Sequence, residues 1–100
     1  MREIALAKLD KTRPVLILTR EAVRHAMHNV TVAPITTTIK GLSTEVRLGS
    51  DNGLNETCVA SIDNIVTIPV GALGKAVGYL LPKQERSLAD AFLAAFDLEL

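Results

Sequence analysis

The chain has 100 residues, 48% of them hydrophobic but only 3% aromatic, and it contains no tryptophan. This composition predicts one globular domain, residues 1–100, with an aliphatic core, and it excludes a platform of several aromatic side chains for stacking bases. One cysteine and two histidines exclude a disulfide framework and a multi-cysteine zinc site, so neither a cofactor nor a metal is expected.

Charge and hydropathy bear on the partners and the cellular compartment of the protein. Eleven basic and eleven acidic residues give zero net charge, so no overall basic character points to nucleic acid. No apolar run approaches the roughly 20 residues of a membrane span, and the first residues lack the apolar core of a secretory signal. The sequence therefore predicts a cytoplasmic protein without membrane contact.

Most of the chain is typical of short β-strands separated by turns. Residues 20–28 fit a short helix or a loop, and Pro34 is expected at a bulge or a sheet edge because proline cannot donate a ladder hydrogen bond. The expected strands cover residues 3–9, 14–19, 29–38, 43–48, 57–61, 64–68 and 75–80.

The last segment, from Pro82 onward, predicts a helix. Proline suits a first helical turn, and apolar residues recur at spacings of three and four. The expected apolar stripe consists of Leu88, Ala91, Phe92, Ala95 and Phe96. Five to seven short strands followed by one helix indicate a mainly β (α+β) fold, a small barrel or curled sheet packed by the C-terminal helix.

Polar residues interrupt the apolar strands at three places. Arg13 opens one strand, Thr36 closes another, and Asp63 separates two more, so a curled sheet could gather all three at one rim. Each also has an ordinary interpretation: a solvated arginine in a turn, a threonine that favours strands, and an aspartate in a hairpin turn.

Familiar catalytic spacings and phosphate loops are absent from the sequence. His25 and His28 have only Glu21 nearby as a further ligand, which favours loop or surface histidines over a metal site. Cys58 lies in an apolar strand and is expected to be a small buried residue rather than a nucleophile.

The order of these motifs resembles the MazF/PemK/Kid toxins. The resemblance covers nearly the whole chain, and its best motif is the TRPVLI stretch followed by PIT some twenty residues later. The matching segments are Thr12–Leu18, Val32–Thr36, Asp63–Ile68 and Leu81–Pro82 with the closing helix.

The resemblance implies an SH3-like barrel of the CcdB/PemK type that forms a homodimer. It also implies a type II toxin that cleaves single-stranded RNA without metal and inhibits translation and growth, and that is neutralised by an antitoxin protein in the RNA groove. Cleavage would proceed by attack of the RNA's own 2′-hydroxyl and leave 2′,3′-cyclic phosphate and 5′-hydroxyl ends.

The family's motif assigns roles to individual residues of this chain. Arg13 matches the family's catalytic arginine and Thr36 its active-site threonine or serine, while Asp63 falls where some members carry a functional acid. We expect Arg13 to stabilise the charged phosphorane, Thr36 to donate to a phosphate oxygen, and Asp63 either to accept the 2′-hydroxyl proton or, as slightly preferred, to orient Arg13. Lys11, Arg20, Lys40, Arg47 and Asn64 are candidate RNA contacts, although for the four basic residues the solvated surface is the ordinary interpretation.

Two other readings of the same fold stay open. One is a gyrase poison of the CcdB type. Toxins of that type depend on a C-terminal tryptophan, whereas this chain ends Asp97-Leu98-Glu99-Leu100 and contains no tryptophan. The other is an inactive barrel kept for dimerisation or antitoxin binding. The chain also departs from the family in its first turn, where only Asp10–Thr12 separate two strands, so no substrate preference is carried over.

Overall fold

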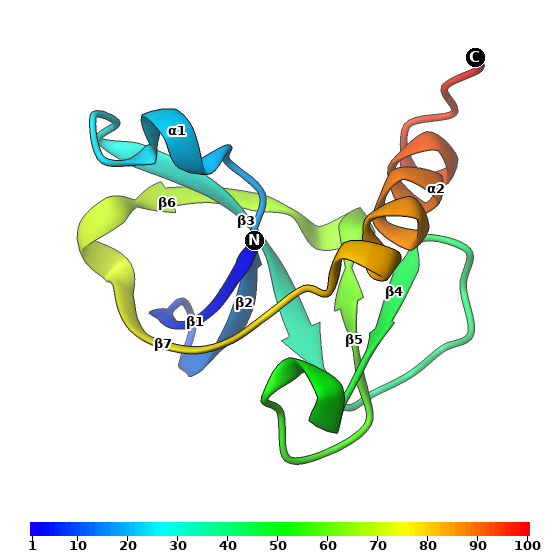
Figure 1. Ribbon diagram of the computed structural model, residues 1–100, viewed down its shortest axis with the longest axis horizontal. Helices are drawn as coiled ribbons and strands as arrows, with labels where there is room; N and C mark the ends of the chain where they lie inside the picture. Colours follow the sequence, from blue (N-terminus) through cyan, green and yellow to red (C-terminus); the bar gives the residue numbers. More distant parts are fainter.

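Seven strands form one antiparallel sheet, curled into a half-barrel, in the computed structural model, which describes residues 1–100 (Figure 1). The mainly β fold with a C-terminal helix is therefore confirmed. The elements are β1 (Glu3–Lys8), β2 (Thr12–Ile17), α1 (Glu21–Arg24), β3 (Asn29–Thr36), β4 (Glu45–Leu48), β5 (Cys58–Ser61), β6 (Val66–Pro69), β7 (Leu73–Tyr79) and α2 (Glu85–Ala95).

Strand β3 joins the two halves of the sheet. The strand order is β4-β5-β3-β2-β1-β7, and β6 also pairs with β3. One edge of β3 pairs with β2. The other edge pairs with β6 up to Val32 and with β5 from Ile35 onward. Pro34 lies between these two partners while it pairs with Val15 of β2. A residue without an N–H fits this break in the ladder, where the sequence predicted a bulge or an edge.

Two apolar clusters cover the two faces of the curled sheet. In β2, Leu16 belongs to one cluster, and Val15 and Ile17 belong to the other, because successive side chains of a strand point to opposite faces. The first cluster includes Leu88 and Ala91 of α2, so the helix is packed against one face. The core is aliphatic, as the composition predicted.

Helix α2 begins three residues after Pro82, where the sequence predicted its start, and it ends one residue before Phe96, the last residue of the expected apolar stripe. A short 3-10 turn, Pro82–Gln84, precedes it. Leu88 and Ala91 are buried, whereas Phe96 is 51% exposed because the helix ends at Ala95. Phe96 thus lies at the exposed end of the expected stripe, and its ring stacks on Phe92 with centroids 5.8 Å apart.

The amides of buried Asn52 and half-buried Gln84 hold the turn Ser50–Asn52 against the rest of the fold. Asn52 is 2% exposed, and its Nδ2 donates to the Tyr79 carbonyl (2.9 Å) and to Gln84 Oε1 (2.6 Å). Its Oδ1 accepts from the backbone N–H of Gly49 (3.1 Å), and Gln84 Oε1 accepts from Leu81 N–H (2.9 Å). This pair fastens the β4–β5 connection to β7 and to the start of α2.

Two glycines face each other where this connection crosses β7. A Cβ on Gly78 would collide with the carbonyl oxygen of Asn52, and one on Gly53 would collide with that of Val77. Gly53 also has φ +83°, a left-handed conformation that glycine adopts without strain. The β4–β5 connection therefore lies directly on the β7 backbone.

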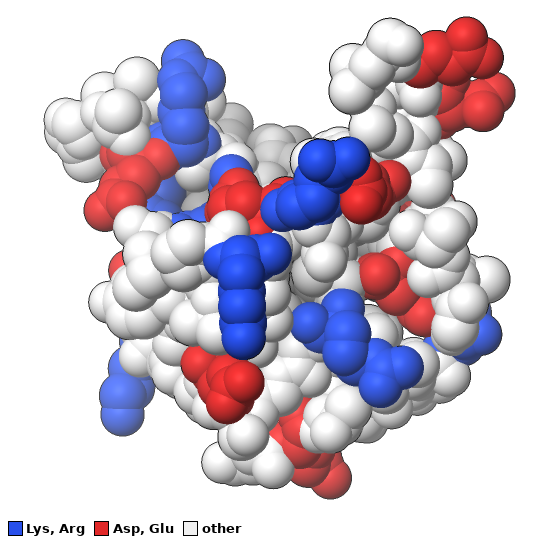
Figure 2. Space-filling view, turned by 45° about the vertical axis from the view of Figure 1, so that its right-hand side comes forward, with Lys and Arg blue, Asp and Glu red and all other residues white.

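The surface carries both charge signs. In the view of Figure 2, basic and acidic side chains are interspersed, and acidic groups stand out where the C-terminal segment projects. Neither helix has the length or apolar character needed to cross a bilayer.

Candidate active site

Arg13 and Thr36 lie on neighbouring strands. Val15 of β2 pairs with Pro34 of β3, and Leu16 pairs with Ala33. The same register, carried two residues beyond the Val15–Pro34 pair, sets Arg13 opposite Thr36. Both residues share the sheet face of Val15 and Ile17, because side chains two apart in a strand point the same way. They form the polar end of a buried apolar row, at the rim of the sheet.

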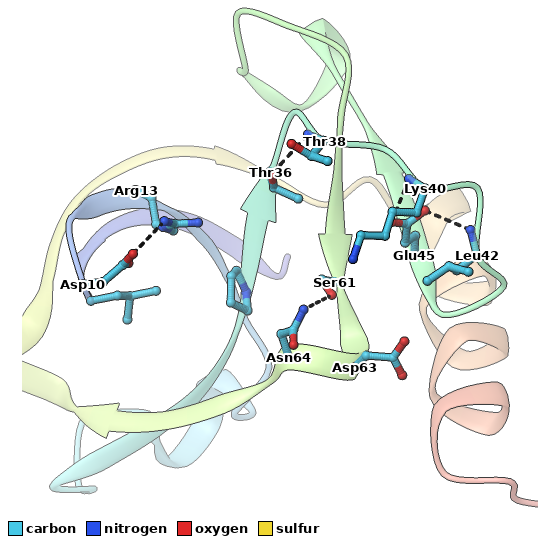
Figure 3. Close-up of a pocket in the computed structure, with 12 residues that line it drawn as sticks. Asp10, Arg13, Thr36, Thr38, Lys40, Leu42, Glu45, Ser61, Asp63 and Asn64 are labelled. Carbon is cyan, nitrogen blue, oxygen red and sulfur yellow. Dashed lines mark hydrogen bonds and ion pairs between the residues drawn. The ribbon is translucent and has the colours of Figure 1, made fainter.

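This rim borders a cavity of about 510 Å³, which we call hollow 1 (Figure 3). Ten of its 12 lining residues are not hydrophobic. Its walls come from β2, β3, the β3–β4 loop (residues 37–44) and the 3-10 turn Ile62–Asn64. Its lining residues are Leu9, Asp10, Arg13, Pro34, Thr36, Thr38, Lys40, Leu42, Glu45, Ser61, Asp63 and Asn64. The three residues that the sequence grouped, Arg13, Thr36 and Asp63, therefore line one hollow.

A second cavity, hollow 2, of about 390 Å³, lies on the other side of Arg13 and Thr36. Lys11, Asn55, Glu56 and Cys58 contribute to its lining. Arg13 and Thr36 alone line both hollows, so the pair forms the ridge between them. A chain crossing this ridge could place one unit in each hollow.

Arg13 is held by an acid that the sequence analysis missed. Its Nη2 donates to Asp10 Oδ2 at 3.2 Å, across the turn between β1 and β2. Asp10 is 74% exposed and Arg13 25%. Arg13 Nε is buried and has no hydrogen-bond partner in the protein, whereas Nη1 and the second hydrogen of Nη2 make no hydrogen bond within it. The Nη groups are therefore the donors that can meet an anion.

The Thr36 hydroxyl also keeps its donor free. Thr36 Oγ1 accepts a hydrogen bond from the backbone N–H of Thr38 at 3.1 Å. This contact fixes the position of the oxygen and leaves its hydrogen available to an oxygen in the hollow. Arg13 and Thr36 thus present donors to the same space from two strands.

Asp63 lies in hollow 1 but does not orient Arg13. Its Oδ2 accepts from Thr44 Oγ1 at 2.6 Å, and the side chain lies across the hollow from Arg13 (Figure 3). The preferred expectation that Asp63 holds Arg13 is corrected here: Asp10 does so, because it sits three residues before Arg13 in a tight turn. Next to Asp63 in the chain, Asn64 donates from Nδ2 to Ser61 Oγ at 2.8 Å.

The other candidate RNA contacts divide between these hollows and the rest of the surface. Lys40 and Asn64 line hollow 1, and Lys11 lines hollow 2. Arg20 borders a separate small cavity beside α1, and Arg47, exposed on β4, lines neither hollow. Charge in the sequence did not indicate which basic residues share a rim.

Glu45 is a second residue that sequence reasoning missed. Its carboxylate accepts three backbone hydrogen bonds from the β3–β4 loop, at Lys40, Gly41 and Leu42. Partial desolvation acts to raise the pKa of Glu45, but these donors and the nearby Lys40 ammonium outweigh it, and the pKa is lowered from its usual value. The carboxylate therefore stays ionised to lower pH than a free glutamate.

Cys58, at the edge of hollow 2, is buried, and its Sγ faces the Leu48 carbonyl at 3.9 Å. Burial and the neighbouring Glu56 raise the pKa of the thiol, which disfavours the reactive thiolate. No group of three or more His, Cys, Asp or Glu side chains is arranged to hold a metal ion.

Comparison with known proteins places the chain among toxins. The sequence profile of a family described as PemK-like, MazF-like toxin of type II toxin–antitoxin system matches residues 3–96. Endoribonuclease MazF3 of Mycobacterium tuberculosis is 61% identical over 99 residues, which cover 99% of this chain and 96% of that protein.

Solved structures agree with this assignment. The Mycobacterium tuberculosis toxin MazF-mt6 matches with a TM-score of 0.97 and 60% identity, over 99% of this chain and all (100%) of that one. An endoribonuclease in complex with its cognate antitoxin, from a mycobacterial species, matches with a TM-score of 0.86 and 25% identity, over 98% of this chain and 94% of that one.

Proposed function

The chain belongs to the PemK-like, MazF-like family of type II toxins, and from this membership we propose that its Arg13–Thr36 ridge is the place where RNA is cut. The chain is an endoribonuclease toxin of a toxin–antitoxin system. The observation that carries the assignment is that these two donors, from adjacent strands, alone border both hollows. We propose further that residues 1–100 act as one toxin domain.

RNA can be cut at such a ridge without a metal. The 2′-oxygen of one nucleotide attacks its own 3′-phosphorus, so that a new O–P bond forms while the bond to the next 5′-oxygen breaks. The products are a 2′,3′-cyclic phosphate and a 5′-hydroxyl. The protein must take up the 2′-hydroxyl proton, stabilise the added charge on phosphorus and allow a proton to reach the leaving oxygen.

Arg13 and Thr36 stabilise the pentacoordinate phosphorus. The planar guanidinium matches two phosphate oxygens, and its hydrogen bond to the exposed Asp10 restrains its orientation. The Thr36 hydroxyl donates to a third phosphate oxygen and fixes the position of the RNA strand along the groove. Donors set in place before reaction act where charge develops, which is the largest single contribution in many such reactions.

Asp63 is the candidate acceptor of the 2′-hydroxyl proton. It lines hollow 1, and its hydrogen bond to Thr44 uses only Oδ2. The other oxygen, Oδ1, can accept a proton from a nucleotide bound in that hollow. Asp10 serves a different purpose in this scheme, because its carboxylate is engaged with Arg13.

The RNA strand runs from one hollow to the other over the ridge. Lys40 and Asn64 then contact the part in hollow 1, and Lys11 the part in hollow 2. Arg20 and Arg47 lie outside this path and would meet only RNA that extends beyond it. We place a cognate antitoxin in the same groove; the mycobacterial relative is an endoribonuclease in complex with its cognate antitoxin.

A homodimer is the assembly that we propose for the toxin. Apolar side chains exposed outside the two hollows, on β6, on β7 and in the turn between them, are suited to such a contact: Val66, Val70 and Tyr79 are each about two-fifths exposed (40%, 39% and 45%).

The decisive experiment compares Arg13→Ala with the parent on total RNA and on a short single-stranded RNA. Cleavage should fall by roughly 100- to 1,000-fold or more, because one preorganised charged donor is removed. Thermal stability should change little, since the ion pair with exposed Asp10 contributes about 0–1 kcal/mol.

Arg20→Ala is the matched control, because it removes an arginine outside the groove and should leave cleavage near the parental rate. An Arg13→Ala protein that cuts as fast as the parent would refute the assignment. A chelator should leave activity unchanged, and loss of activity with EDTA would reject the metal-free scheme. Stalled gyrase–DNA complexes without new RNA ends would favour a gyrase poison instead.

A further inference from the structure

The β3–β4 loop, which has no regular secondary structure, forms one wall of hollow 1. Thr38, Lys40 and Leu42 of this loop line the hollow. The Lys40 side chain extends from the loop into the hollow (Figure 3) and forms no ion pair in the protein. How this ammonium group meets RNA therefore depends on how the loop backbone is held.

A single carboxylate holds the tip of that loop. Glu45 Oε1 accepts from Gly41 N–H (2.8 Å) and Leu42 N–H (3.0 Å), and Oε2 accepts from Lys40 N–H (3.2 Å). The backbone N–H of Glu45 itself donates to the Leu42 carbonyl (3.1 Å). Gly41 adopts φ +76°, which lets three consecutive N–H groups point at one side chain.

We propose that Glu45 is a positioning residue for RNA binding, which acts by fixing the backbone from which Lys40 reaches into hollow 1. This inference rests on the proposed function of the groove. The Glu45 carboxylate binds the loop backbone, whereas the unpaired Lys40 ammonium group can contact a phosphate of the RNA strand. A loop held in advance loses less conformational entropy when RNA binds.

The sign of the effect separates this role from simple electrostatics. Removing a negative charge near a groove for RNA should strengthen binding if charge alone matters. If Glu45 positions Lys40, removing it should weaken binding although the net charge becomes more favourable. Glu56, an acid in the lining of hollow 2 that holds no loop backbone, shows what charge removal alone does.

The test is a double-mutant cycle on KM and kcat, with a fluorogenic single-stranded RNA that the parent cleaves. Lys40→Ala and Glu45→Ala should each raise KM about fivefold, equivalent to ~1 kcal/mol, with kcat within about twofold. The double variant should bind about as well as either single variant, because both changes remove the same contact. Glu56→Ala should lower KM.

Salt dependence gives a second readout that a merely structural role would not move. The slope of log affinity against log salt should fall in magnitude by about 0.7 in Lys40→Ala, in Glu45→Ala and in the double variant alike, as expected for one phosphate contact on a single strand. Glu45→Gln, which keeps an amide oxygen for part of the loop, should lie between parent and Glu45→Ala and guards against a fold defect.

Multiplicative KM effects in the double variant, or a lowered KM in Glu45→Ala, would overturn the inference. An unchanged salt slope in Glu45→Ala would overturn it as well. These failures are distinct from failure of the proposed function, in which the parent itself would not cleave RNA.

Discussion

Two polar clusters of this molecule differ in how completely their hydrogen-bonding groups are used. In the pair of buried Asn52 and half-buried Gln84, the amide groups bond to each other and to the backbone at Gly49, Tyr79, Leu81 and Arg47. At the ridge, Arg13 makes one hydrogen bond to an exposed acid, and the Thr36 hydroxyl accepts one without donating. The first cluster is fully partnered and the second has donors left over.

The difference separates structure from function. A buried amide without partners would destabilise the fold, so the Asn52–Gln84 pair is satisfied and its removal should cost stability. The spare Arg13 Nη and Thr36 hydroxyl donors at the open rim cost little because water can hydrate them, and they are what a phosphate requires; only Arg13 Nε is buried without a partner. Changes in the two clusters should therefore have opposite signatures, one in stability and the other in cleavage.

The largest effect should come from Arg13→Lys, which keeps the charge but removes the planar fork. We expect RNA cleavage to fall by about 100-fold or more, because an ammonium group cannot contact two phosphate oxygens in the same way. Single-turnover cleavage rates measure the effect, and thermal melting should stay near that of the parent. Parental activity in this variant would mean that charge alone suffices at the ridge.

Asn52→Ala should have the opposite signature. Gln84 and the Tyr79 carbonyl would lose buried partners, so the free energy of unfolding should fall by about 2–4 kcal/mol. Urea denaturation measures this loss. Asn64→Ala is the matched control for stability, because that amide bonds only to the Ser61 hydroxyl at the surface and should change stability by less than about 0.5 kcal/mol.

Thr36→Val tests the hydroxyl with little change of shape. We expect cleavage to fall by about 10- to 100-fold, since the donor to phosphate is lost while the β-branched side chain is kept. Thr36→Ser should retain most of the activity, and it controls for loss of the methyl group. Equal activity of the valine and serine variants would remove Thr36 from the reaction.

The smallest effect concerns acid stability. Because the pKa of Glu45 is lower in the folded protein, ionised Glu45 stabilises the fold at neutral pH, and this contribution disappears as pH falls through the lowered pKa. The melting temperatures of the parent and Glu45→Gln should therefore differ at pH 6 and converge in acid. A difference that stays constant with pH would contradict the role of the ionised carboxylate.

Much of the fold could be predicted because its signals are local. Strand alternation, turn residues and the apolar stripe near the C-terminus place every strand and α2 within a few residues of their observed positions. The grouping of Arg13, Thr36 and Asp63 also followed from strand ends that meet at one rim. The spacing pattern included Phe96 in the apolar stripe, but it did not mark the end of the helix one residue before Phe96.

The contacts within the site were not predictable in the same way. Asp10 looks like ordinary turn chemistry, and only the tightness of the β1–β2 turn brings its carboxylate to Arg13. Glu45 looks like an ordinary polar residue of a strand, and the sequence does not reveal that a loop of eight residues folds back onto it. Likewise, Arg20 and Lys40 look alike in the sequence, and the path of the backbone alone separates them.

The close approach of Gly53 and Gly78 has a consequence for redesign of this protein. Neither position has room for a side chain, so any engineered variant must keep glycine at both, where the β4–β5 connection crosses β7. Asn55 and Glu56, just beyond it, are exposed and border hollow 2. A combinatorial library that varies these two and retains both glycines would alter what the groove selects while the scaffold beneath it is preserved.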